Sequence, residues 1–166
     1  MHELIKYFST ISDDARGIIL VSGLTFFLLL EAWNPLFKFN YGKTKHAFLN
    51  IFFNVTTMII NLLGAILIYN AAIFNSSNSS GLLNIFTMPL WLYILLGLLL
   101  MDLIGSWLIH YIQHKIKWMW KFHLIHHTDP YVDVTSGLRH HPGESVFRLI
   151  FTILAVLVTG VPFGVV

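Results

Sequence analysis

Long apolar stretches alternate with short polar segments along this chain, and the pattern predicts an all-α integral membrane fold. A helix needs about 20 mostly apolar residues to cross a bilayer. The Asn34-Pro35 pair follows the first apolar run and favours a helix end there. We expect a single membrane domain over residues 1–166, with residues 1–17 as an interfacial N-terminal segment. About four transmembrane helices are predicted, near residues 18–37, 47–74, 89–112 and 146–166.

The distribution of basic residues predicts how these helices are oriented. The loop 38–46 carries three lysines, the loop 75–88 carries no charge, and residues 115–148 carry three lysines and two arginines. The stretch 47–74 is long enough for one tilted crossing or for a tight hairpin. A single crossing puts both basic segments on one side, which the positive-inside rule makes cytoplasmic. We therefore expect one crossing, a cytoplasmic segment at 113–145, and the N-terminus on the opposite side.

Composition agrees with the membrane assignment and narrows the chemistry. Hydrophobic residues make up 56% of the chain, charged residues only 11%, and the mean hydropathy is +0.72, which leaves too few polar groups to cover a water-facing surface. The sequence has no basic block, so no nucleic-acid partner is expected. It also has no cysteine, which excludes disulfides and thiolate-bound metals. Any metal must be held by nitrogen or oxygen ligands.

Histidine is the residue type whose placement points to chemistry. Of the 9 histidines, seven lie between residues 110 and 141. His110 and His114 are four residues apart, so they share one face of a helix. His123, His126 and His127 have i, i+3 and i+4 spacing and again share one face. Two helical faces can therefore present five imidazoles to a common point at the end of the third predicted span.

A cluster of this size is typical of a metal site. Imidazole suits zinc, copper, iron and nickel, and a single structural zinc needs only four ligands. Five or more histidines exceed that number, so the pattern indicates two metal ions. Lone histidines at a membrane interface are more simply anchors, but HxxxH followed closely by HxxHH fits that alternative poorly. His2 and His46 do stand alone, and we expect them to be exposed or interfacial.

These boxes, together with the segment Arg139-His140-His141-Pro142-Gly143-Glu144, resemble the fatty acid hydroxylase/sterol desaturase superfamily of integral-membrane di-iron oxygenases. The resemblance covers residues 102–148. It implies a non-haem centre of two iron ions that uses O2 to hydroxylate or desaturate a C–H bond of a fatty acyl or sterol-like lipid. Electrons would come from a cytochrome b5-like or ferredoxin-like partner. The metal ligands that it implies are His110, His114, His123, His126 and His127.

One feature of that superfamily is missing. Its members have a third histidine box, another HxxHH, downstream of the segment at 139–144, and this sequence ends at Val166 without one. We therefore expect either a chain that is incomplete at its C-terminus or an inactive homologue with a structural or metal-binding role in the membrane. A haem-b electron-transfer protein is a further alternative, but it requires single histidines deep inside two different spans.

A few residues outside the boxes are expected to contact the ligands. Asp102 lies two helical turns before the first box and is expected to accept an N–H from a ligating histidine, or else to make a plain interhelical hydrogen bond. His141 is either a further ligand or simply a good helix start, and His140 is a weaker candidate. Glu144 and Arg139 are expected beside the ligands, where Arg139 pairs with Glu144 or faces the polar end of a lipid.

Overall fold

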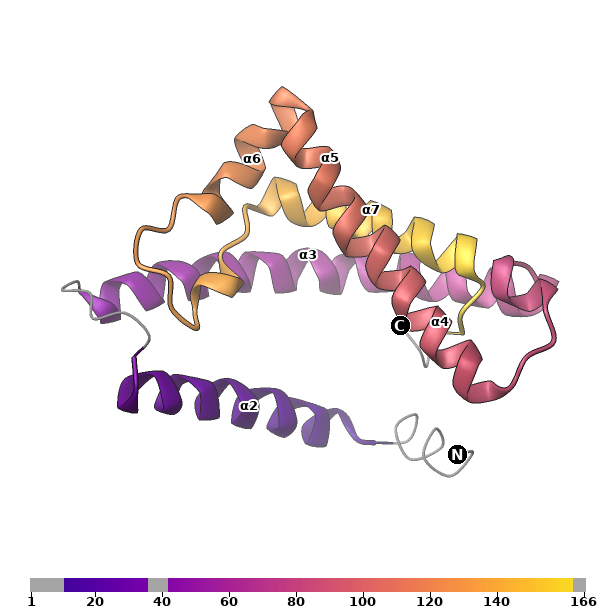
Figure 1. The fold of residues 1–166 in the computed structure, drawn as a ribbon, viewed down its shortest axis with the longest axis horizontal. Coiled ribbons are helices and arrows are strands. Elements are labelled where there is room, and N and C mark those ends of the chain that lie inside the picture. Colours follow the sequence, from indigo (N-terminus) through magenta and orange to yellow (C-terminus); the bar gives the residue numbers. More distant parts are fainter. Residues whose placement is uncertain (1–10, 36–41, 163–166) are drawn as a thin grey trace.

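The computed structural model describes residues 11–35 and 42–162, and within these ranges it contains helices and connections but no strand (Figure 1). In chain order the elements are α2 (Asp13–Trp33), α3 (Lys43–Asn78), η1 (Leu82–Ile85), α4 (Leu90–Asp102), η2 (Leu103–Leu108), α5 (Ile109–Lys115), α6 (Lys117–His127), η3 (Ser136–Leu138) and α7 (Pro142–Thr159). Four helical stretches are long and apolar enough to cross a membrane. They are Asp14–Trp33, Lys43–Ile85, Leu90–Lys115 and Pro142–Thr159. The expected all-α integral membrane fold is confirmed.

The first span begins earlier and ends earlier than the sequence predicted. The Ser12 hydroxyl accepts a hydrogen bond from the Ala15 amide at 3.3 Å, so α2 begins at Asp13 instead of at residue 18. It ends at Trp33, where the Asn34 amide bonds back to the Leu30 carbonyl. Most of the expected interfacial segment 1–17 lies outside the described residues, as do residues 36–41 and 163–166.

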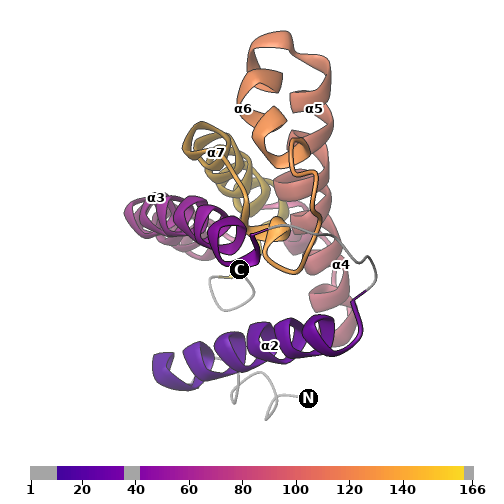
Figure 2. The same ribbon diagram turned by 90° about the vertical axis from the view of Figure 1, so that its left-hand side faces the viewer.

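The second span is a single helix, so the hairpin alternative is wrong. Its 36 residues, Lys43–Asn78, extend the apolar stretch at both ends and correspond to about 54 Å at 1.5 Å per residue. This exceeds the roughly 30 Å of a hydrocarbon layer. Both ends of α3 therefore reach polar surroundings, or the helix is tilted. In both views α2 lies on one side of the bundle, away from α5 and α6 (Figures 1 and 2).

The third span contains a π-helical turn that the sequence did not reveal. Leu103–Leu108 form this segment, η2, between α4 and α5. Gly105 is buried there, and a β-carbon at this position would lie 3.6 Å from the backbone of Thr152 in α7. A π turn holds one extra residue, so the residues that precede it are rotated by about 100° around the helix axis. Asp102 therefore does not lie on the helix face that carries His110 and His114.

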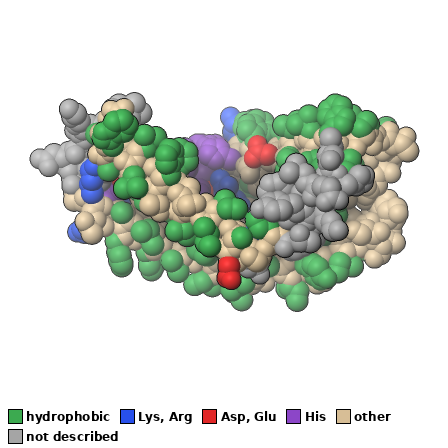
Figure 3. Space-filling view, turned by 90° about the horizontal axis from the view of Figure 1, so that it is seen from below, with side chains coloured by type: hydrophobic (Ala, Val, Ile, Leu, Met, Phe, Trp, Pro, Cys, Tyr) green, Lys and Arg blue, Asp and Glu red, His purple; other side chains and the backbone are tan. Residues whose placement is uncertain are grey.

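Polar and apolar side chains share the interior of the bundle, whereas its outer surface is apolar. Large hydrophobic side chains are exposed along every span, and patches of them spread across the face in Figure 3. The buried apolar cluster consists of the small residues Ala71, Ala72 and Val156, where α7 packs along α3. Beside it the Asn75 side chain donates to the Val156 carbonyl at 2.6 Å. Apolar side chains outside and hydrogen-bonded polar side chains inside suit a protein that is surrounded by lipid.

Two glycines allow the backbone to close the end of the bundle that lies away from the histidines. Gly81 has φ 105° and Gly160, which ends α7, has φ 80°. The two residues touch: a β-carbon on Gly81 would overlap the backbone of Gly160. The Tyr93 hydroxyl and the Asn84 amide both donate to the Gly160 carbonyl, at 3.1 and 3.2 Å. This contact joins the end of α3 to the end of α7.

A Gly81→Ala substitution is therefore expected to destabilise the fold. The backbone strain alone costs about 1–3 kcal/mol, and the overlap with Gly160 adds to it. Thermal unfolding in detergent, followed by circular dichroism, measures the loss. Gly23→Ala is the control, because a β-carbon there meets nothing within 4 Å. Equal melting temperatures for the two variants would contradict the assignment of this contact.

Candidate metal centre

The histidines of the two boxes lie on two short helices that fold back on each other. α5 continues the third span and ends at Lys115, and α6 begins at Lys117. Between them Ile116 is extended, with φ −97° and ψ 112°, which reverses the chain direction (Figure 1). The first box and the second box therefore face each other across this turn.

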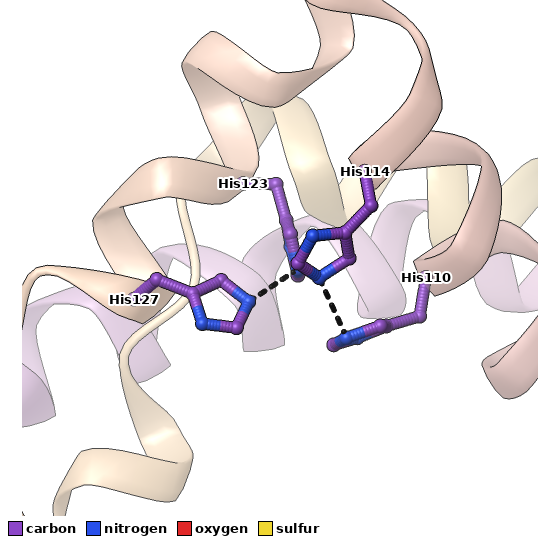
Figure 4. A group of neighbouring side chains, drawn as sticks. All are labelled: His110, His114, His123 and His127. Atoms are coloured by element: carbon purple, nitrogen blue, oxygen red, sulfur yellow. Dashed lines mark hydrogen bonds between the residues drawn. The ribbon is translucent and has the colours of Figure 1, made fainter.

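Four histidines converge there. His110 and His114 from α5 meet His123 and His127 from α6, and one ring nitrogen from each lies within 4.8 Å of the others (Figure 4). The Nε2 atoms of His110 and His114 are 3.1 Å apart, and those of His123 and His127 are 3.0 Å apart. Nitrogens that share one ion at about 2.1 Å lie about 3.0–3.4 Å apart. The spacing within each pair thus suits a common metal ion.

The electrostatics of the cluster also favour a metal. Burial lowers the pKa of His123 to about 4, although the neighbouring Glu144 acts in the opposite direction. Burial likewise lowers the pKa of His126 and of His127. These rings are therefore held neutral, which is the form that binds metal. His114 and His127 are exposed, so the cluster is open on one side.

Glu144 lies directly behind the cluster. Its carboxylate is fully buried, and its Oε1 atom is 3.1 Å from Nδ1 of His123. The same oxygen lies 3.2 Å from Nδ1 of His140 and 3.2 Å from Nε of Arg148. Because Nδ1 of His123 faces a carboxylate, its Nε2 faces the cluster as the ligand atom. Carboxylates commonly hold metal-binding histidines in this way.

The remaining histidines of the region do not join the four. His126 stacks on His140, with ring centroids 4.8 Å apart and an interplanar angle of 17°. His141 caps α7, because its Nδ1 accepts the Gly143 amide at 2.9 Å. The sequence favoured His141 over His140 as a further ligand. In the structure His140 lies beside Glu144 and His126, whereas His141 caps the start of α7. Two parallel rings do not aim their nitrogens at one point.

Asp102 and Arg139 lie elsewhere than expected. Asp102 is exposed at the end of α4, and no hydrogen bond or ion pair joins it to a histidine within the described residues. The π turn explains this displacement. Arg139 does not pair with Glu144; its guanidinium is 3.8 Å from Asp129, and Arg148 is the arginine that contacts Glu144.

Three residues that sequence analysis missed also belong to this region. The Trp120 ring lies 5.0 Å from His114 and 5.5 Å from His127, on the face of α6 that carries His123 and His127. Its i, i+3 and i+7 spacing with those histidines was the signal available. Gln113 is fully buried with neither amide atom hydrogen-bonded. A shallow pocket of about 240 Å³ opens beside Trp120 and His114.

His46 is the third missed residue, and its side chain is not exposed, contrary to one of the two expectations for it. Its side chain is only 8% exposed. Nε2 lies 2.7 Å from Asp129 and Nδ1 lies 2.9 Å from Asp133. The two aspartates are more than 80 positions away in sequence, so no local pattern indicated this contact. His2, the other lone histidine, lies outside the described residues.

Comparison with known proteins supports the resemblance seen in the sequence. The model of the fatty acid hydroxylase family matches residues 94–166, which include both histidine boxes, the connecting loop and α7. No curated protein and no solved structure was found to match the chain. This part of the chain is thus similar to the fatty acid hydroxylase family, and the described residues outside it add α2, α3, η1 and the start of α4.

Replacing Glu144 by glutamine is expected to weaken metal binding by about 10- to 100-fold, because His123 loses the carboxylate that fixes its ring. Titration of the metal-free protein with Co(II), followed by visible absorption, measures this affinity. Asp102→Asn is the matched control and should bind Co(II) like the wild type. A Glu144→Gln variant with unchanged affinity would remove the role given to this carboxylate.

Proposed function

We propose that this chain, with a fatty acid hydroxylase domain at residues 94–166, is a membrane-bound non-haem iron oxygenase that hydroxylates or desaturates a C–H bond of a lipid. The observation that carries the proposal is the convergence of four imidazoles from two facing helices at the end of a membrane span. Fatty acyl and sterol-like lipids are the substrate class, since the outer surface of every span is apolar.

His110, His114, His123 and His127 would hold an iron ion, and His126, whose ring centroid lies 5.2 Å from that of His127, is the remaining imidazole of the two boxes that a second ion could use. Iron would supply the activation of O2, in which one O2, two electrons and two protons convert R–H to R–OH and one water. The chain's own residues hold and orient the ligands. Glu144 keeps the proton on Nδ1 of His123, and Trp120 covers the rings of His114 and His127.

Two alternatives make different demands on this site. An inactive homologue would keep the fold and a metal-binding role in the membrane without oxidising lipid. A haem-b carrier needs a slot for a porphyrin between two histidines. The imidazoles of the cluster instead pack directly on one another, with ring centroids 4.4 Å apart for His110 and His123 and 4.7 Å apart for His123 and His127. The geometry favours bare metal ions over haem.

Iron loading with lipid turnover tests the proposal. We expect detergent-purified protein to bind iron without a haem Soret band, and to add 16 Da to a lipid, or remove 2 Da, when supplied with O2 and a reductant. Label from ¹⁸O₂ should enter a hydroxylated product. The His110→Ala/His123→Ala double variant is the control and should show neither iron nor turnover. Iron binding without any lipid product would favour the inactive homologue.

Electrons would come from a cytochrome b5-like or ferredoxin-like protein on the side where the cluster lies. We propose that this side is cytoplasmic. The basic residues Lys43 and Lys45 begin α3 at the same end of the bundle as the loop that follows α6, since His46 contacts Asp129. Lys115, Lys117 and Lys121 lie at the end of α5 and in α6, beside the cluster, whereas the Asn/Ser-rich turn follows the other end of α3. The positive-inside rule therefore assigns the side that carries the histidine cluster to the cytoplasm.

The absence of native cysteines allows a direct test of this orientation. A Ser79→Cys variant should react with a membrane-impermeant maleimide added to intact cells. A Lys117→Cys variant should react only after the membrane is permeabilised. Labelling is measured by the shift in mass of the purified chain. The reverse pattern would place the histidines on the outer side and overturn the cytoplasmic assignment.

A further inference from the structure

The loop between α6 and α7 joins the second histidine box to Glu144, and it is held by a buried ionic cluster. We propose that His46 in α3 is a positioning residue for the metal centre, because it clamps this loop through Asp129 and Asp133 and so fixes the end of α6. The inference rests on the proposed function, since it takes the histidine cluster to be a metal site. His46 itself does not touch the cluster.

The contacts of His46 define its charge state. Its two ring nitrogens lie 2.7 and 2.9 Å from carboxylate oxygens of Asp129 and Asp133, whose side chains are 3% and 9% exposed. A carboxylate accepts hydrogen bonds and does not donate them, so both ring nitrogens must carry hydrogen. His46 is therefore a cation between two anions. Arg139, 3.8 Å from Asp129, supplies a second positive charge and balances the cluster.

Hydrogen bonds within the loop hold both aspartates in place. Ser136 donates to Asp129 at 2.5 Å. The Thr135 amide and hydroxyl donate to the other oxygen of Asp133, at 2.8 and 2.6 Å. Each carboxylate thus binds His46 with one oxygen and its own loop with the other. The loop and α3 form one connected polar unit.

Two further contacts anchor the same loop to the first two spans. The Asn50 side chain in α3 donates to the Thr135 hydroxyl at 2.9 Å. The Glu31 carboxylate near the end of α2 accepts the Val134 amide at 2.9 Å. Both spans lie outside the region matched by the family model. Residues of α2 and α3 therefore fix a loop that lies within the matched region.

The position of the clamp connects it to the ligands. Asp129 follows His127, the last residue of α6, by two positions, and Arg139 immediately precedes His140. One end of the clamped loop thus carries His127 of the cluster, and the other carries His140, which stacks on His126. Between α6 and α7 the only regular element among the described residues is the short η3. Without the clamp this connection would gain conformational freedom, and ordering it on metal binding would cost free energy.

A His46→Ala variant of the full chain tests the proposal. Co(II) titration of the metal-free protein in detergent should show about 10-fold weaker binding. The visible absorption spectrum of the Co(II) form should also change, which a contact that merely stabilises the fold would not cause. Asp133→Asn, which removes one of the two ionic contacts, should have a smaller effect in the same direction. It serves as the test if His46→Ala does not fold.

Tyr93→Phe is the matched control, because it removes hydrogen bonds to Gly160 and Asn84 at the opposite end of the bundle. It should lower the unfolding midpoint and leave Co(II) binding unchanged. Unchanged affinity and spectrum in folded His46→Ala and Asp133→Asn would overturn the proposal, as would equal weakening by Tyr93→Phe. A wild-type chain that binds neither Co(II) nor iron would overturn the proposed function as well.

Discussion

The constraint on which this structure depends is that polar groups inside a bilayer must find their partners inside the protein. A buried amide without a partner costs several kcal/mol in an apolar medium. Asn75 meets this demand by donating to the backbone of α7 and accepting from Ser80, and the Asn50 nitrogen does so by donating to Thr135. The Thr57 and Ser145 hydroxyls, 2.8 Å apart, join α3 to the start of α7. Interactions that contribute little in water thus determine how the spans pack.

Most of the exceptions to this rule among the described residues lie around the histidines. His126 Nδ1, Glu144 Oε2 and both amide atoms of Gln113 are buried without a hydrogen-bond partner. In folded proteins such atoms are few, and they commonly mark a site that binds something. These incompletely paired groups lie where the histidine spacing predicts a metal, whereas two others, Asn50 Oδ1 and Arg139 Nε, lie in α3 and in the loop between α6 and α7. The same cluster opens toward the surface at His114 and His127.

Sequence periodicity predicted what depends on local spacing. The i, i+4 pairs of both boxes face one point because α5 and α6 are regular helices. Asp102 escaped the prediction because a π turn depends on how Gly105 packs against α7, and no sequence period encodes that contact. His46 escaped it because its partners lie more than 80 residues away. Glu144 lies beside His123, but the arginine that contacts Glu144 is Arg148, one helical turn beyond it, and not Arg139.

A buried carboxylate beside the histidine cluster needs a compensating positive charge whether or not a metal is bound. Glu144 lies in the first turn of α7, where the positive end of the helix dipole stabilises a negative charge. Arg148 and two imidazoles contact the same oxygen, so the charge is balanced within the protein itself. The histidines can therefore be oriented in the metal-free chain, unlike those of small zinc domains that fold only with their ion. The ionic cluster around His46 is likewise balanced by the protein's own residues, so most of the ordering needed to bind metal is already achieved by folding.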